Sequence, residues 1–173
     1  MEEAQMADSA QYPRAQPREH SVMLSQVWCA VRVGVWLLGL PIRLHRQSLP
    51  RLLDRLAVVK GQPSSGSPQE MDRMVRLVVR VCHLRCFRPP LFPRACLRQA
   101  LALYYTLCRM GYPVAIHFGI HKVEEALHGH SWVTVQGQVV AESRPVEVFH
   151  EVYSYPPAIA CADHVQHGSV RGS

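Results

Sequence analysis

The sequence predicts an α+β fold, because helical patterns fill the first part of the chain and short strand patterns follow them. Apolar side chains recur every three or four residues over 94–110. Pro93 precedes this stretch and Gly111 follows it, as is typical of the start and the end of a helix. Residues 114–120 then alternate apolar with other side chains, as a half-buried strand does. Helices followed by antiparallel strands predict helices packed on one side of a sheet.

Length and composition restrict the class of protein. The 173 residues, 48% of them hydrophobic, suffice for one domain with tails and exclude a wholly disordered chain. The formal net charge of +6 favours acidic partners, but basic and aromatic residues do not interleave, so we expect no nucleic-acid partner. The six cysteines form no paired framework and the N-terminus does not resemble a signal peptide, which predicts a cytoplasmic protein with free thiols.

The first apolar segment is about as long as a membrane span. Residues 21–40 have the pattern of a helix that is apolar nearly all round, and Pro41 is expected to end it. Arg32 lies near the middle of this segment, where a charge is costly in hydrocarbon. We therefore favour a helix that is buried or lies at a membrane surface over a true span. Membrane contact through residues 22–40 is the less favoured alternative for the chain.

Further patterns complete the expected organisation. Other elements are expected as helices over 49–59 and 71–86, strands over 130–134 and 138–142, and a loop over 121–129. Residues 60–69, KGQPSSGSPQ, have the composition of a linker. The predicted division is a flexible tail (1–20), an N-terminal helical segment with the linker (21–70), a core (71–152) and a C-terminal tail (153–173).

Cys96 is a candidate nucleophile, because it stands in the first turn of the helix predicted over 94–110. Unpaired backbone N–H groups and the helix dipole at that end favour a thiolate. Arg94 and Arg98 add positive charge nearby. The alternative is a buried structural cysteine, the commoner fate of a cysteine on a helix.

His130 and Glu142 are the candidate base and orienting acid, and their placement depends on the turn between the last two predicted strands. A two-residue turn would need a positive φ at Gln136, which suits Asn or Asp better, so we expect a three-residue loop that ends at Gly137. That register sets His130 opposite Glu142, where the side chains can share a hydrogen bond. With Cys96 they would form a set of nucleophile, base and orienting acid. The alternative is a surface His–Glu pair of small energetic value.

Several motifs occur together over about residues 71–150. They are Cys96-Leu97, Ala-Leu-Ala-Leu at 100–103, Gly-x-Pro at 111–113, Gly119-Ile120, His130-Ser131-Trp132-Val133 and Gly137. Together they resemble the transglutaminase-like cysteine peptidases of lasso-peptide biosynthesis, which are related to the microcin-processing protein. Ser131 stands where that family usually has alanine, and Glu142 stands where aspartate often occurs.

The resemblance implies a transglutaminase- or papain-like core, in which the helix that bears the nucleophile packs on a small antiparallel sheet. It implies Cys96 as the nucleophile, His130 as the base and Glu142 as the third member of a triad. The implied reaction removes the leader from a ribosomally synthesised precursor peptide through a thioester on Cys96. The implied partners are the precursor, a leader-recognition protein and an ATP-dependent lasso cyclase. No cofactor or metal is expected for this chain, which has no phosphate-binding glycine loop.

Other interpretations compete with this one. The same scaffold suits a transglutaminase that delivers the acyl group to an amine, and a non-catalytic module could bind peptides along a sheet edge. Cys82, His83 and Cys86 are close in sequence but lack the fourth ligand that a zinc site needs. Trp132 shares a strand face with His130, and we expect it to pack in the core rather than to line a substrate groove.

Overall fold

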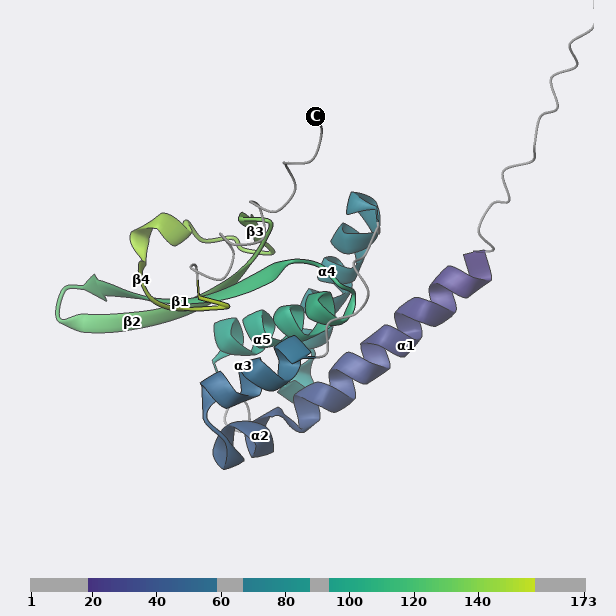
Figure 1. Ribbon diagram of the computed structural model, residues 1–173, viewed down its shortest axis with the longest axis horizontal. Helices are drawn as coiled ribbons and strands as arrows, with labels where there is room; N and C mark the ends of the chain where they lie inside the picture. Colours follow the sequence, from purple (N-terminus) through teal and green to yellow (C-terminus); the bar gives the residue numbers. More distant parts are fainter. Residues whose placement is uncertain (1–18, 59–66, 88–93, 158–173) are drawn as a thin grey trace, which may run out of the picture.

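The computed structural model describes residues 19–58, 67–87 and 94–157, and it confirms the predicted α+β class (Figure 1). The elements in chain order are α1 (Glu19–Leu38), α2 (Leu40–Arg46), α3 (Leu49–Val58), α4 (Pro68–Cys82), a 3-10 turn (Arg85–Phe87), α5 (Ala95–Arg109), β1 (Val114–Val123), β2 (Ala126–Val135), β3 (Gln138–Val140), a 3-10 turn (Val146–Val148) and β4 (His150–Tyr155). Most of the predicted linker (60–69) and of the predicted tails (1–20 and 153–173) lies outside the described residues.

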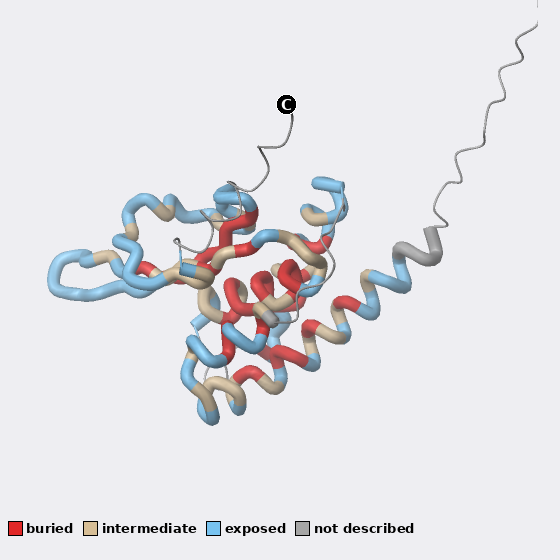
Figure 2. Tube along the Cα trace, viewed as in Figure 1, coloured by how far each residue is buried: buried red, intermediate tan, exposed pale blue. Residues whose placement is uncertain are grey.

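One hydrophobic cluster joins all five helices to the sheet (Figure 2). α5 lies at its centre, because every side chain from Ala100 to Tyr104 is at most 2% exposed. Consecutive buried residues point to all sides of a helix, so α5 is packed nearly all round in this stretch. Leu37, Leu40 and Leu53 belong to the same cluster, and the N-terminal helices therefore pack on the helix that carries Cys96.

The apolar segment expected as one helix forms two helices. α1 ends at Leu38 and α2 begins at Leu40, because Pro41 fits the first turn of a helix, where its missing N–H costs no hydrogen bond. Within the described ranges, no single helix is long and apolar enough to cross a membrane. α1 and α2 taken together pass that test on length and composition, with a bend of 41° between them.

The sheet has the strand order β3-β2-β1-β4, with antiparallel pairing throughout. β1 and β2 pair from Val114↔Val135 to Val123↔Ala126. The prediction of a loop over 121–129 is therefore wrong, because these residues form the end of a long hairpin. The hairpin closes at Glu124, which has a φ of 53°. β4 has no counterpart among the predicted strands; it pairs with the other side of β1 and takes up the start of the predicted C-terminal tail.

The turn between β2 and β3 differs from the predicted one. Val135 pairs with Gln138, so the turn has two residues, and the predicted three-residue loop with its register is wrong. Gln136 and Gly137 have φ values of 51° and 80°, the two positive values of a type I′ turn. The twist of this turn matches the twist of the strands, and that match outweighs the cost of a positive φ at glutamine.

The two faces of the sheet have different surroundings. Ile116, Val133 and Val135 belong to the hydrophobic core on the face that α5 covers (Figure 1). His130 and Trp132 alternate with these residues along β2, so they lie on the opposite face.

Candidate active site

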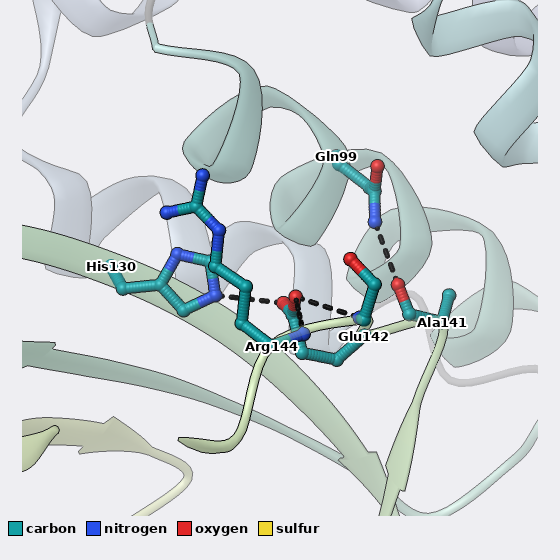
Figure 3. A network of polar contacts seen from close by, with 6 residues as sticks. Gln99, His130, Ala141, Glu142 and Arg144 are labelled. Carbon is teal, nitrogen blue, oxygen red and sulfur yellow. Dashed lines mark hydrogen bonds and ion pairs between the residues drawn. The ribbon is translucent and has the colours of Figure 1, made fainter. Parts of the chain in front are cut away.

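His130 and Glu142 form a short, well-shielded hydrogen bond. His130 Nε2 lies 2.7 Å from Glu142 Oε2, and the two side chains are only 6% and 11% exposed. The other oxygen, Oε1, accepts hydrogen bonds from the backbone N–H of Ser143 at 2.9 Å and of Arg144 at 3.1 Å (Figure 3). Both carboxylate oxygens are engaged, so the carboxylate is fixed and in turn fixes the imidazole ring. Because Nε2 faces Glu142, Nδ1 is the ring nitrogen left to exchange a proton with another group.

A break in β3 brings Glu142 to His130. The last pair of β2 with β3 is Val133↔Val140, and two more residues in this register would set Glu142 opposite Ser131. The predicted cross-strand pairing of His130 with Glu142 therefore does not occur. The strand ends before this point, and Ala141 takes a φ of 57°. That left-handed residue turns the chain out of the strand. The predicted contact therefore forms, but through a turn and not through strand pairing.

Cys96 lies in the first turn of α5, where its thiol is free and partly buried. The N–H of Arg98 donates to the carbonyl of Arg94 at 3.1 Å, which is the first hydrogen bond of the helix. The N–H groups of residues 95–97 therefore have no partner within the helix. In the described structure the Arg94 side chain does not cap them. Open N–H groups and the helix dipole favour a negative charge at this end.

A side chain of α5 joins the helix to the turn that carries Glu142. Gln99 Nε2 donates a hydrogen bond of 2.9 Å to the carbonyl of Ala141, one residue before Glu142 (Figure 3). Gln99 lies about one helical turn after Cys96. The structure thus joins His130 and Glu142 directly and brings the helix of Cys96 to the same turn. Sequence reasoning missed Gln99, although its i+3 spacing from Cys96 on a helix was a usable signal.

Aromatic rings pack against the imidazole of His130. The ring centroid of Phe149 lies 4.8 Å from it with 30° between the planes, and that of Trp132 lies 6.2 Å away with 19°. His117 stacks on Trp132 at 5.5 Å. Trp132 is buried, as expected of a core residue, but it packs in this aromatic group and not in the cluster around α5.

Gly119 makes room for these rings. It is the cross-strand partner of His130. A Cβ at this position would lie 2.9 Å from Trp132 Cζ3 and 3.0 Å from Phe149 Cβ. Carbon atoms of separate side chains do not approach so closely, so the absence of a side chain permits the aromatic packing around His130.

A second His–Glu pair lies nearby on the same sheet. His117 Nδ1 is 2.8 Å from Glu151 Oε2, and His117 Nε2 is 2.9 Å from Thr134 Oγ1. Both nitrogens of this ring are engaged, which leaves neither for proton exchange with a nucleophile. His130 is therefore the better placed of the two histidines to act as a base.

Arg98, expected to act on Cys96, has a different environment. It is buried and donates a hydrogen bond to the carbonyl of Phe87. Burial raises the pKa of the Cys82 thiol to about 12, and the charge of Arg98 opposes that shift. The guanidinium thus holds the 3-10 turn at Arg85–Phe87 against α5.

The cysteines around this turn do not belong to a cluster of possible metal ligands among the described residues. Cys82 is buried, whereas Cys86 is exposed. Within the part of the chain that the structure describes, no three His, Cys, Asp or Glu side chains gather in a way that could hold a metal ion.

Comparison with known proteins agrees with this architecture. The model of the transglutaminase-like superfamily matches residues 36–154, which is more than half of the chain and includes Cys96, His130 and Glu142. The match begins in α1 and ends in β4, so it takes in α2 and α3 as well as the helix and sheet of the candidate site. No curated protein and no solved structure matches the chain. Because the family model matches more than half of its residues, the chain belongs to the transglutaminase-like superfamily.

Proposed function

We propose that this chain is a cysteine peptidase that removes the leader from a ribosomally synthesised, lasso-type precursor peptide. The observation that carries the proposal is the shielded hydrogen bond between His130 Nε2 and Glu142 Oε2, which leaves Nδ1 to serve as a base. Membership of a superfamily whose members are usually cysteine peptidases or transglutaminases supports an acyl-transfer reaction. The motifs around Cys96 and His130 support the narrower assignment to leader removal.

The proposed reaction begins at Cys96. Its thiol gives a proton to His130 Nδ1, and the sulfur attacks the carbonyl carbon of the last leader residue. The open N–H groups at the start of α5 are suited to stabilise the oxyanion that forms. The imidazolium returns its proton to the leaving amine as the C–N bond breaks, which frees the N-terminus of the core peptide and leaves the leader as a thioester.

Hydrolysis then regenerates the thiol. His130 takes a proton from water as the oxygen attacks the thioester carbonyl. The C–S bond then breaks to release the leader as a carboxylic acid, and the imidazolium returns its proton to the sulfur of Cys96. Glu142 stabilises the imidazolium in both halves of the reaction, because its negative charge lies 2.7 Å from the ring nitrogen. The freed amine is the group that a cyclase would join to a side-chain carboxyl.

In this proposal, Cys96 and His130 approach each other around the edge of β2. His130 lies on the face opposite α5, in the stretch of β2 that extends past the end of β3. Along that stretch, no strand of the described residues covers the edge. The hydrogen bond from Gln99 to Ala141 supports the approach, because it holds α5 beside the turn that follows β3.

The partners are part of the same proposal. A cytoplasmic leader-recognition protein would present the precursor, and a separate ATP-dependent cyclase would close the ring. The net charge of +6 suits an acidic leader or partner, through electrostatic steering of their encounter. The steps assigned to Cys96, His130 and Glu142 need no cofactor.

The test of the reaction is the mass of the product. When the chain is incubated with a candidate precursor and its recognition protein, we expect the free leader and core peptide. An isopeptide-linked product with loss of ammonia would instead indicate a transglutaminase. We expect Cys96→Ala to stop processing while precursor binding persists. Processing or biological output that survives this substitution would contradict the proposed nucleophile.

Alkylation tests the nucleophile without a substrate. Cys96 should react with iodoacetamide faster than the exposed Cys86 near neutral pH, because the proposed base His130 would take the proton from its thiol. Cys29, Cys82 and Cys108 are buried and should react more slowly still. Equal rates at Cys96 and Cys86, read by mass spectrometry of tryptic peptides, would contradict an activated thiol.

A further inference from the structure

An open groove runs between α4 and β3 and ends at the candidate site. Its volume is about 550 Å³, which is within the range of small-ligand and peptide pockets. The α4 wall carries apolar residues such as Val75 and Val79, with Arg76 and Arg80 beside them. The opposite wall is β3 itself, through to Ala141, which directly precedes Glu142.

The β3 wall presents backbone hydrogen-bonding groups to the groove. β3 is an edge strand, and its only strand partner in the described sheet is β2. In a two-residue hairpin the residues that flank the turn, here Val135 and Gln138, exchange backbone hydrogen bonds, and the next pair does not. The N–H and C=O of Val139 therefore point away from β2. An extended chain can pair with such an edge as an added strand.

Charge on the other wall adds a preference. Arg76 is neutralised by Asp72, whose carboxylate lies 2.6 Å from its guanidinium. Arg80 is exposed and forms no ion pair among the described residues. The groove thus offers an unpaired positive charge across from the backbone groups of Val139.

We propose that this groove binds an extended segment of the substrate polypeptide as an additional strand along β3, with an acidic side chain of that segment against Arg80. The proposal rests on the proposed function in taking the occupant to be the substrate. The bond from Gln99 to Ala141 marks the inner end of the groove. A bound substrate that extends beyond Ala141 reaches Glu142 and the first turns of α5. The groove would therefore direct the cleavage site of the substrate to Cys96.

The test measures binding in the full chain with Cys96→Ala, so that it does not depend on cleavage. The probes are two fluorescein-labelled, end-blocked peptides of alternating Thr and Val, one with Glu and one with Lys at the centre. We expect the Glu peptide to bind more tightly than the Lys peptide. Hydrogen exchange should show protection of the Val139 amide when the Glu peptide is added.

Two substitutions locate the site. Arg80→Glu should weaken the affinity for the Glu peptide about fivefold and raise the affinity for the Lys peptide, because it reverses one charge on the groove wall. Arg73→Glu is the matched control, since this residue is exposed on the same helix but does not line the groove. Val139→Pro removes the outward N–H and should weaken the binding of both peptides. We expect this variant to fold, because prolines are tolerated at sheet edges. Val152→Pro, at the bulge of the opposite edge strand, should not weaken them.

The outcomes separate this proposal from the proposed function. Binding that is absent, or that is equal in Arg80→Glu, Val139→Pro and their controls, would overturn the groove assignment. With the native thiol present, we expect Arg80→Glu and Val139→Pro to raise the KM for the precursor more than they lower kcat. A chain that binds the Glu peptide in the groove but never cleaves a precursor would refute the peptidase assignment alone.

Discussion

The side-chain amide of Gln99 donates a 2.9 Å hydrogen bond to the backbone carbonyl of Ala141, and this bond connects the helical layer to the turn that holds Glu142. The two residues are 42 positions apart in the chain. Gln99 comes from the helix that carries Cys96, and Ala141 is the first residue after β3 and directly precedes Glu142. The relative position of the thiol and the His–Glu pair therefore depends on a contact that neither element makes alone.

Gln99→Ala should reduce catalysis more than stability. The lost hydrogen bond is worth only about 1 kcal/mol of folding free energy. A small displacement of a reacting group can cost about 100-fold in rate, so we expect a clear fall in kcat/KM and in the alkylation rate of Cys96. Gln47→Ala is the control, because it removes a side-chain hydrogen bond of 2.8 Å, donated by Arg55, in a part of the sequence that does not include the candidate site. Equal activity in the two variants would show that the Gln99 bond does not position the site.

Glu142→Gln should leave the fold intact and slow the reaction about 100- to 10,000-fold in kcat, because glutamine keeps the size of the side chain but not its charge. The charge at 2.7 Å from His130 is what stabilises the imidazolium. Glu151→Gln makes the same change in the His117 pair and should preserve activity. Steady-state kinetics on the precursor distinguishes the two, and a normal kcat in Glu142→Gln would exclude an electrostatic role for this residue.

Gly119→Ala should destabilise the protein by about 1–3 kcal/mol, because the added methyl overpacks the space between Trp132 and Phe149. The displaced rings contact His130, so the alkylation rate of Cys96 should fall as well. Gly129→Ala is the control on the neighbouring strand, where a Cβ meets no atom within 4 Å. Urea unfolding measures both variants, and equal midpoints would contradict the tight packing at Gly119.

Ser131→Ala should stabilise the protein by about 1 kcal/mol. Ser131 Oγ is buried without a hydrogen-bond partner among the described residues, and burying such a hydroxyl costs free energy. Thr134→Val on the same strand should instead destabilise the protein, because it removes a hydroxyl that forms a hydrogen bond with His117. A loss of stability in Ser131→Ala, measured by urea unfolding, would mean that this hydroxyl has a partner in solution.

Alkaline pH should destabilise the protein in part through Cys82. Burial raises the pKa of this thiol from 9.0 to about 12, so between these values the unfolded chain loses a proton that the folded chain keeps. Stability is therefore intact below pH 9 and falls above it, by about 1.4 kcal/mol per pH unit from this group. Cys82→Ala should have a shallower dependence of unfolding free energy on pH between 9 and 11. Cys86→Ala, at an exposed position, should keep the slope of the parent chain, and identical slopes in all three would refute the prediction.

The sequence by itself determined the fold class, the helix with Cys96 at its start and the strand that bears His130. Those features depend on local patterns: apolar spacing along α5, the residues that bound it, and alternation along β1. The contact of His130 with Glu142 was also predicted, but for the wrong reason. The register was wrong because Gln136 accepts a positive φ within a type I′ turn, and Ala141 then restored the contact by turning the chain.

Tertiary structure alone decided the rest, because the deciding contacts join residues that no local pattern relates. Only folding brings Gln99 to Ala141, packs Phe149 on His130, and sets β3 beside α4 to form a groove. The energy of such contacts depends on the burial and the distance of both partners. Neither quantity can be read from one stretch of chain, because both are set when the helices and the sheet close over a common core.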